Sequence, residues 1–128
     1  DRAEMSHHEN ISVLAYSALA GGFLTGKYLD GSVPKNSRLS RVSSLFGRIN
    51  ENSTLAVKEY VSLARSFNLE PVHMALAFCN QRPFMGSVIF GATDKLQLTK
   101  IINGLDIVLS DELLDELNKL YKKYPITF

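Results

Sequence analysis

The sequence predicts an α/β fold with parallel strands, and two observations support this. Two short apolar runs, residues 11–16 and 86–91, have the length and composition of β-strands. Segments with apolar residues at helical spacing follow each run, and this alternation is typical of a parallel sheet whose crossovers are helices. Two strands are too few for a closed barrel or for a stable isolated sheet. The fold is therefore expected to be incomplete.

The composition is that of a globular protein and excludes several classes of function. Of the 128 residues, 45% are hydrophobic and 21% are charged, which argues against a disordered chain. The net charge of +1 gives no reason to expect binding to nucleic acid or to an anionic membrane. No apolar run approaches the ~20 residues that span a bilayer, and no signal peptide is visible. The single cysteine, Cys79, excludes an intrachain disulfide, and we expect the chain in the reducing cytoplasm.

The first part of the chain is expected to hold a helix end, one strand and a long loop. Residues 1–10 resemble the last turns of a helix that leads into the first strand. That strand, residues 11–16, is predicted to be buried on most of its surface because most of its side chains are apolar. Turn signals predict a loop over residues 28–50. A loop of this length in a compact domain is either functional or mobile, and the residues leave both alternatives open.

Two helices are predicted between the loop and the second strand. Asn52 or Ser53 is expected to cap the first of them, which runs to about residue 67. Pro71 fits the first helical position of the second, because proline lacks an N–H that would be unpaired there. Pro83 is expected to end that helix.

Two more helices are predicted after the second strand. The first runs from Lys95 to about residue 103, and Gly104 is its expected stop. Ser110 is expected to begin the last helix. Asp111 and Glu112 lie in its first turn, where negative charge suits the helix dipole.

A candidate anion-binding segment follows the first strand. Gly21 and Gly22 allow close approach of backbone to a ligand, Ser17 and Thr25 add hydroxyls, and Lys27 adds a mobile positive charge. Such residues at the end of a strand can form an anion cradle. The segment matches neither phosphate-loop template, so a flexible loop is the alternative.

A second candidate segment follows the second strand. The strand ends in Gly91, and a helix N-terminus comes directly after Thr93, so backbone N–H groups there can hold a phosphate. The alternative is a capping box of the Asp-x-x-Gln kind. In that case Asp94 accepts from the Gln97 N–H, and the Gln97 side chain reaches back.

Both segments resemble parts of the aldo-keto reductases. The stretch AYSALAGGFLTGKY, residues 15–28, is similar to the end of the seventh barrel strand in that family, and SVIFGATDKLQL, residues 87–98, is similar to the eighth strand and its loop. The similarity is greatest to the bacterial Tas branch, which is related to potassium-channel β subunits. The resemblance covers essentially the whole chain but less than half of the barrel. It implies the C-terminal part of a TIM (β/α)8 barrel, incomplete as a barrel, from a truncated or longer protein.

The resemblance also implies how the segments divide. The single fragment would comprise a helix tail at residues 1–10, strand seven and the cofactor loop at 11–50, helices at 51–82, strand eight with the phosphate-binding loop and helix at 86–104, and the C-terminal helix at 105–128.

NADPH is the cofactor that the resemblance implies. The matching positions along the pyrophosphate are Ser17, Leu19, Gly21 and Lys27. Arg38 lies in a loop that folds over the cofactor in the channel-subunit branch, and a guanidinium can contact phosphate through two hydrogen bonds. The positions that match the site of the adenosine 2′-phosphate are Gly91, Thr93 and Gln97.

Several positions depart from the family pattern. Ala18 stands where the family usually has a proline, and Phe23 differs as well. Asn36 stands where the channel-subunit branch has a tyrosine, and Lys100 and Ile101 stand where a Glu and an Asn face the adenine. Ile101 cannot make the hydrogen bonds of an amide, and Lys100 reverses a charge. Recognition of the adenine is therefore expected to differ.

No catalytic residue is expected in this chain. The family's Asp, Tyr, Lys and His tetrad lies on the first four barrel strands, and none of the tyrosines here matches its motifs. No metal site is expected either, because His7 and His8 are adjacent on a predicted helix and point in different directions.

Two functions are therefore open. The chain is either the NADPH-binding, C-terminal portion of an aldo-keto reductase, inactive alone and with weak or absent cofactor binding, or a non-catalytic truncated remnant that acts only by self-association. The expected partners are the missing N-terminal barrel portion or copies of the same chain, with no nucleic acid and no membrane.

Overall fold

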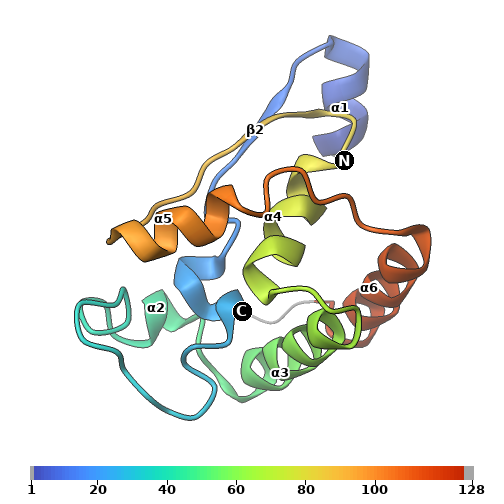
Figure 1. The fold of residues 1–128 in the computed structure, drawn as a ribbon. Coiled ribbons are helices and arrows are strands. Elements are labelled where there is room, and N and C mark those ends of the chain that lie inside the picture. Colours follow the sequence, from blue (N-terminus) through green and yellow to red (C-terminus); the bar gives the residue numbers. More distant parts are fainter. Residues whose placement is uncertain (1, 126–128) are drawn as a thin grey trace.

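A computed structural model describes residues 2–125 of the chain. The elements, in order, are α1 (Arg2–Glu9), β1 (Val13–Ala15), the 3₁₀ helix η1 (Ala20–Thr25), α2 (Ser44–Gly47), α3 (Glu51–Ser66), α4 (Pro71–Asn80), β2 (Met85–Val88), α5 (Lys95–Ile102) and α6 (Asp111–Lys123). Figure 1 shows the strand pair on one side of the molecule, α3 and α6 on the other, and α4 between them. The end of the predicted C-terminal segment, residues 126–128, lies outside the described residues.

The predicted α/β architecture with parallel strands is confirmed. β1 pairs with β2 in a two-stranded parallel sheet, with Ala15 opposite Val88 and an irregularity between Val13 and Leu14. The Ile89 N–H donates to the Ala15 carbonyl at 2.7 Å and extends the pairing past the last ladder residue. The two strands therefore end at the same edge of the sheet.

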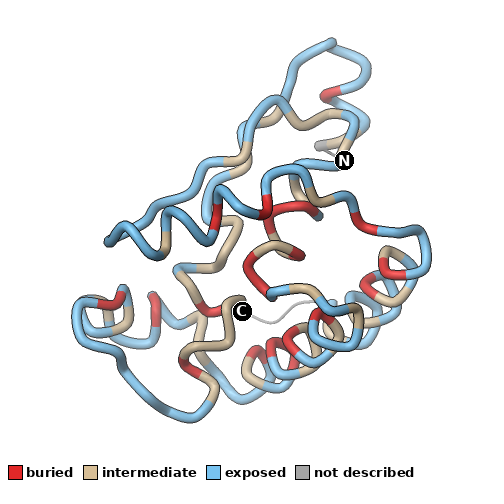
Figure 2. The backbone as a smooth tube through the Cα atoms, in the orientation of Figure 1, coloured by how far each residue is buried: buried red, intermediate tan, exposed pale blue. Residues whose placement is uncertain are grey.

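The strands are shorter and more exposed than the sequence predicted. The first was expected at residues 11–16 and the second at 86–91, but β1 and β2 cover three and four residues. The prediction that the first strand is buried on most of its surface is wrong, since Leu14 is 62% exposed and Tyr16 is 75% exposed. The physical reason is that neither face of this open pair of strands is fully covered, as the largely exposed upper part of Figure 2 shows.

The largest core lies among three helices. α3, α4 and α6 meet around a set of apolar side chains that are at most 6% exposed: Ala64, Met74, Ala77, Leu109, Leu113 and Leu117. Full burial of a leucine side chain contributes about 1.5–3 kcal/mol, so this cluster stabilises the helical half. The Gln81 amide fixes the entry to α6, because it donates to the Leu109 carbonyl at 3.1 Å and accepts from the Leu109 N–H at 2.8 Å.

A second core anchors the long loop. Tyr28 and Leu45, from the two ends of the loop, are buried with Phe23 of η1 against Val57 and Val61 of α3. The sequence did not predict α2 within this loop, a short turn in which Leu45 and Phe46 have non-helical backbone angles. The loop is therefore fixed to the body at both ends.

A third core attaches α5. Ile101 is buried with Val72 and Leu76 of α4. The imidazole Nε2 of His73 lies 2.6 Å from the Lys100 carbonyl oxygen, which ties the end of α5 to α4. The same ring requires glycine at position 104, because a Cβ there would lie 2.2 Å from the His73 ring. Gly104 thus ends the helix, as predicted, and also admits the imidazole.

The helix caps were predicted with one error. Asn50 caps α3, not Asn52 or Ser53, because its side chain accepts from the Ser53 N–H at 2.9 Å while the Ser53 hydroxyl accepts from the Asn50 N–H. Ser53 is thus the third residue of a capping box, which the sequence alone did not distinguish from a cap. Ser110 caps α6 as predicted and accepts from the Leu113 N–H.

A charged contact between α3 and α6 should make stability depend on pH. Lys123 Nζ and the Tyr124 hydroxyl each donate to Glu59 Oε1 at 2.6 Å. These contacts, that with Lys123 foremost, lower the pKa of the Glu59 carboxyl. A carboxyl with a lowered folded-state pKa contributes stability above its unfolded-state pKa and loses it as the pH falls through the folded value.

We therefore predict that Glu59→Gln lowers the melting temperature slightly at neutral pH, and that the difference from wild type disappears in acid below that pKa. Thermal unfolding followed by circular dichroism across this pH range measures it. Tyr124→Phe retains the lysine contact and should show a smaller effect. A difference that is the same at every pH would contradict the prediction.

Candidate functional site

Both predicted anion-binding segments begin at the carboxyl edge of the sheet. β1 ends at Ala15 and β2 at Val88, and these two residues are paired. In open parallel sheets ligands bind beyond this edge, because the strands point their ends and the following loops toward the same side. The pairing therefore explains why segments about 70 residues apart in sequence start together.

The first segment is folded rather than a flexible loop. It forms η1, in which the Gly22 N–H donates to the Leu19 carbonyl at 2.8 Å and the Thr25 hydroxyl donates to the Gly22 carbonyl at 2.7 Å. Gly22 has a φ of +92°, which a side chain would strain. A Cβ there would also lie 2.9 Å from the Lys27 Nζ, so the lysine ammonium lies directly over the glycine backbone.

Arg38 approaches the same backbone from the long loop. Its Cγ lies 3.7 Å from the position of a Cβ on Gly21, and its guanidinium carbon lies 5.9 Å from the centre of the Phe46 ring. The Lys27 ammonium thus lies at Gly22 and the aliphatic part of Arg38 at the adjacent Gly21, with the guanidinium near Phe46. A short stretch of side-chain-free backbone flanked by a lysine and an arginine is suited to bind a phosphate group.

Ser17 and Leu19 have different settings in the structure. Ser17 is exposed with a φ of +58°, and its carbonyl accepts from the Ala20 N–H at 2.7 Å. Leu19 is half-buried and packs on the third core, which Val72 and Leu76 of α4 form with Ile101 of α5. Leu19 therefore anchors the start of η1 on that core.

The second segment is closed by hydrogen bonds among its own residues. Asp94 accepts from the Gln97 N–H at 2.8 Å and from the Gln97 Nε2 at 2.8 Å. The Gln97 Oε1 accepts from the N–H and hydroxyl of Thr93, each at 3.2 Å. Asp94 is thus the cap of α5, as one alternative predicted, although Gln97 reaches back to Thr93 and not to the Asp94 N–H. Gly91 is exposed, with open space where a side chain would lie.

Lys100 and Ile101, the departures from the family pattern, are engaged with α4. Lys100 Nζ contacts the Glu70 carboxylate at 3.1 Å. Ile101 is 3% exposed, within the third core. Both positions therefore help to attach α5 to the body.

Tyr16 is a candidate that the sequence reasoning passed over. It is 75% exposed and comes directly after the end of β1, immediately before Ser17. An aromatic side chain so exposed beside a predicted ligand segment offers a surface for a planar ring. The position of Tyr16 at the end of a strand could have indicated this role, but the strand was expected to be buried.

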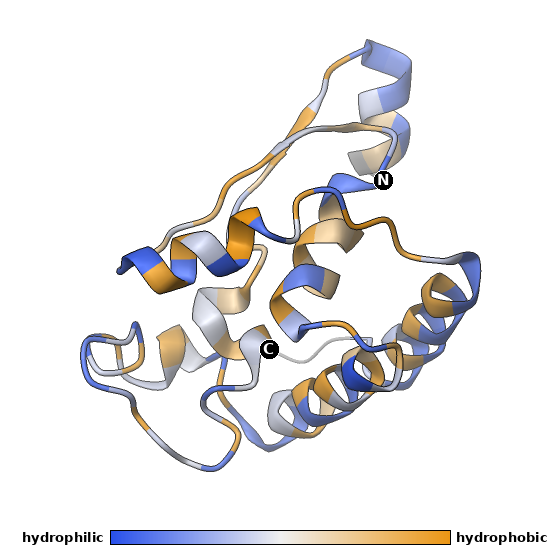
Figure 3. Ribbon diagram, in the orientation of Figure 1, coloured by the Kyte–Doolittle hydropathy of each residue, from blue (hydrophilic) through white to orange (hydrophobic). Residues whose placement is uncertain are grey.

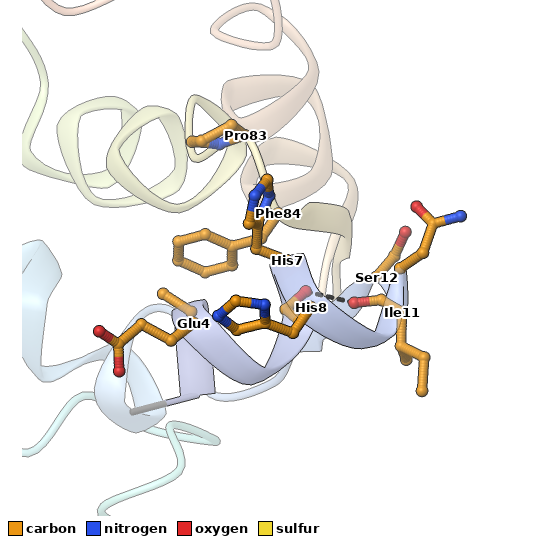
Figure 4. A pocket seen from close by; sticks show the side chains of 10 residues that line it. Glu4, His7, His8, Ile11, Ser12, Pro83 and Phe84 are labelled. Atoms are coloured by element: carbon orange, nitrogen blue, oxygen red, sulfur yellow. Dashed lines mark hydrogen bonds between the residues drawn. The ribbon is translucent and has the colours of Figure 1, made fainter.

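A cavity lies at the other edge of the sheet. It has a volume of about 520 Å³ between α1 and the residues that precede the two strands, and its lining includes His7, Ile11 and Phe84 (Figure 4). Ile11 precedes β1 and Phe84 precedes β2, so this space is at the amino ends of both strands. None of the predicted cofactor-binding residues lines it.

The described residues give little support for a metal site, a reactive thiol or a membrane-spanning helix. No three His, Cys, Asp or Glu side chains in residues 2–125 are grouped to hold a metal ion. Burial raises the pKa of the Cys79 thiol, and Arg82 opposes this to a lesser extent, so the thiol has little thiolate character. None of the helices in the described part of the chain is long and apolar enough to cross a membrane.

Comparison with solved structures confirms the barrel relationship. The chain superimposes on part of a glycerol dehydrogenase from Gluconobacter oxydans with a TM-score of 0.68 and 23% sequence identity, covering 93% of this chain and 36% of that one. At this identity the similarity shows the fold alone. The open two-stranded sheet is consistent with part of that larger architecture.

Sequence comparisons agree with the resemblance seen in the motifs. The chain is 40% identical over 122 residues to Protein tas of Escherichia coli (strain K12), covering 95% of this chain and 35% of that protein. It is 31% identical over 120 residues to a probable voltage-gated potassium channel subunit beta of Oryza sativa subsp. japonica, covering 90% of this chain and 37% of that protein. The chain thus spans about a third of the length of these relatives. The model of the aldo/keto reductase family matches residues 2–122, and the chain belongs to this family.

Proposed function

We propose that this chain is the NADPH-binding, C-terminal portion of an aldo-keto reductase. One observation carries the proposal: Lys27 Nζ and Arg38 Cγ, from separate segments, lie next to the adjacent glycines Gly22 and Gly21, in the segment that follows the carboxyl end of β1. The residue types fit the charge of a pyrophosphate. Glycine at position 22 allows a close backbone approach, and its φ of +92° would strain a residue with a side chain.

Each residue would make a distinct contribution to binding. Lys27 and Arg38 would neutralise the pyrophosphate, with Ser17, Leu19 and Gly21 lining it. Gly91, Thr93 and Gln97 would lie near the 2′-phosphate that distinguishes NADPH from NADH. NADPH, when bound, supplies a hydride for the reduction of an aldehyde or ketone. The reducing cytoplasm suits a chain whose single cysteine is unpaired.

Binding should be weak in this chain alone. Exposed charge contacts are screened by solvent and salt, and most groups that orient the cofactor in a full barrel come from other strands. We expect a dissociation constant on the order of millimolar for NADPH, about −4 kcal/mol, with weaker binding of NADH.

Replacing the two cations tests the cradle. Lys27→Ala and Arg38→Ala should each weaken NADPH binding about two- to fivefold, since an exposed ion pair is worth less than about 1 kcal/mol. Arg41→Ala is the matched control, because Arg41 is an exposed arginine of the same loop. Cofactor fluorescence or calorimetry measures the affinities. Equal loss in the control would contradict the proposal, and equal affinity for NADH would mean that Asp94 and Gln97 are only a helix cap.

We also predict that the chain alone has no reductase activity. Hydride transfer to a carbonyl leaves an oxyanion that needs a proton from a positioned acid. The tetrad tyrosine that supplies it in the family has no counterpart here. Oxidation of NADPH with a nitrobenzaldehyde, compared with a heat-inactivated control, tests this, and turnover above the control would refute it.

Self-association is the second candidate function, and the exposed strands favour it. Ile11, Leu14 and Tyr16 are at least 62% exposed, and Ile89 is 51% exposed. Figure 3 shows apolar residues along the strand pair. A parallel pair also has two edges with unpaired backbone groups, which can pair with other strands. A further copy of the chain, or the N-terminal portion of the barrel, would cover these surfaces.

Light scattering coupled to size-exclusion chromatography tests this association. The wild-type chain should elute as an oligomer, and Leu14→Lys should shift the distribution toward monomer because a charge replaces the apolar contact. Val33→Lys is the control, since Val33 is 52% exposed but lies in the long loop. A stable wild-type monomer would rule out self-association.

A further inference from the structure

Phe46 is presented to solvent by a turn of unusual conformation. Ser44, Leu45 and Phe46 have φ values of +46°, +50° and +61°, and Gly47 follows at +81°. For residues other than glycine, this left-handed backbone conformation costs about 1–2 kcal/mol per residue. Consecutive residues in such a conformation persist only where the surrounding structure holds them, and they are found most often at functional positions.

The side chain of Leu45, next to Phe46, holds this turn against Gly21 of η1. Leu45 is 2% exposed, and its two methyl carbons lie 3.4 and 3.5 Å from the position of a Cβ on Gly21. Because neighbouring residues in the turn point apart, burial of Leu45 leaves Phe46 70% exposed. The aromatic ring is therefore turned to solvent, next to the residue whose side chain packs on the Gly21 position.

Arg38 connects the ring to the charged part of the site. Its guanidinium carbon lies 5.9 Å from the centre of the Phe46 ring, and its Cγ contacts the Gly21 position. One arginine thus spans the aromatic side chain and the glycines. Phosphate-binding cations next to an exposed aromatic ring are the chemistry that recognises a nucleotide, because the ring stacks on the base while the cations bind the phosphates.

We propose that Phe46 is a stacking residue for the planar base of a nucleotide whose phosphates lie on Lys27 and Arg38. This inference rests on the proposed function, since it uses the same cations, and it adds a contact for the ring system. Stacking on a side chain does not depend on the hydrogen-bonding edge of the base. It would therefore offset the loss of polar adenine contacts at positions 100 and 101.

An indole ring at position 46 makes the contact directly measurable. The chain contains no tryptophan, so Phe46→Trp introduces a single fluorophore at the proposed stacking position. We expect ADP and NADPH to quench it in a saturable manner, and inorganic pyrophosphate to leave it unquenched. Phe84→Trp is the matched control, because Phe84 lies at the opposite edge of the sheet, and its fluorescence should not respond to either nucleotide.

The nucleotide affinity of variants without a tryptophan gives a second measurement. Phe46→Leu should weaken binding of ADP and NADPH about five- to tenfold, since stacking of a base on an aromatic ring contributes at this level. Binding of pyrophosphate to Phe46→Leu should be unchanged. Phe46→Tyr, which keeps an aromatic ring, should bind nucleotides as tightly as the wild type. Because Phe46 is largely exposed, these variants should unfold at the wild-type temperature.

The outcomes separate this inference from the proposed function. If NADPH binds and depends on Lys27 and Arg38, but the fluorescence of the Phe46→Trp variant is not quenched and Phe46→Leu binds equally well, the stacking role is refuted and the cofactor function stands. If pyrophosphate affinity falls with nucleotide affinity in Phe46→Leu, the residue shapes the loop and does not stack, which also refutes it. If neither nucleotides nor pyrophosphate bind to any variant, both proposals fail together.

Discussion

The parallel pairing of β1 with β2 is the constraint on which the rest of the structure depends. It aligns Ala15 with Val88, so that the chain leaves both strands at one edge. The segments that follow lead into η1 and into α5, and Leu19 and Ile101 both belong to the third core. This shared core and the sheet together hold the two predicted ligand segments at one end of the molecule.

The site is built from residues with little side chain, supported by residues that are fully buried. Gly21 and Gly22 expose backbone, while Phe23, the next residue, is 2% exposed and joins the core with Tyr28 and Leu45. The Tyr28 hydroxyl also accepts from the Leu39 N–H at 3.4 Å, which holds the long loop near the segment. Backbone with positive φ is costly for other residues, so the packing below it fixes a conformation that the glycines permit.

The molecule has two unequal halves. The helical half, around α3, α4 and α6, encloses a core with a polar tether at Gln81, whereas the strands carry apolar side chains at their exposed surface. A parallel strand pair normally lies between covering elements, because its connections are helices that pack on it. The exposed strands are the structural counterpart of a chain that spans about a third of its relatives.

The sequence by itself determined most of the local structure. Helical spacing and caps predicted α3 to α6 to within a few residues, and the alternation of strands and helices predicted the parallel sheet. Those features depend on neighbours in sequence, such as Ser110 with Leu113 or Pro71 at the start of α4, so the residues alone can show them. The two motifs likewise indicated the family.

Only the tertiary structure decided what these residues contact. The structure shows that the first segment is folded into η1, with Lys27 Nζ and Arg38 Cγ near the glycines, and no pattern in the sequence encodes those distances. The burial of strand residues was predicted wrongly because it depends on elements packed on the sheet, and apolar composition does not reveal their presence. The helix α2 and the placement of Phe46 follow from burial of Leu45 against distant residues, which overrides the local backbone preference.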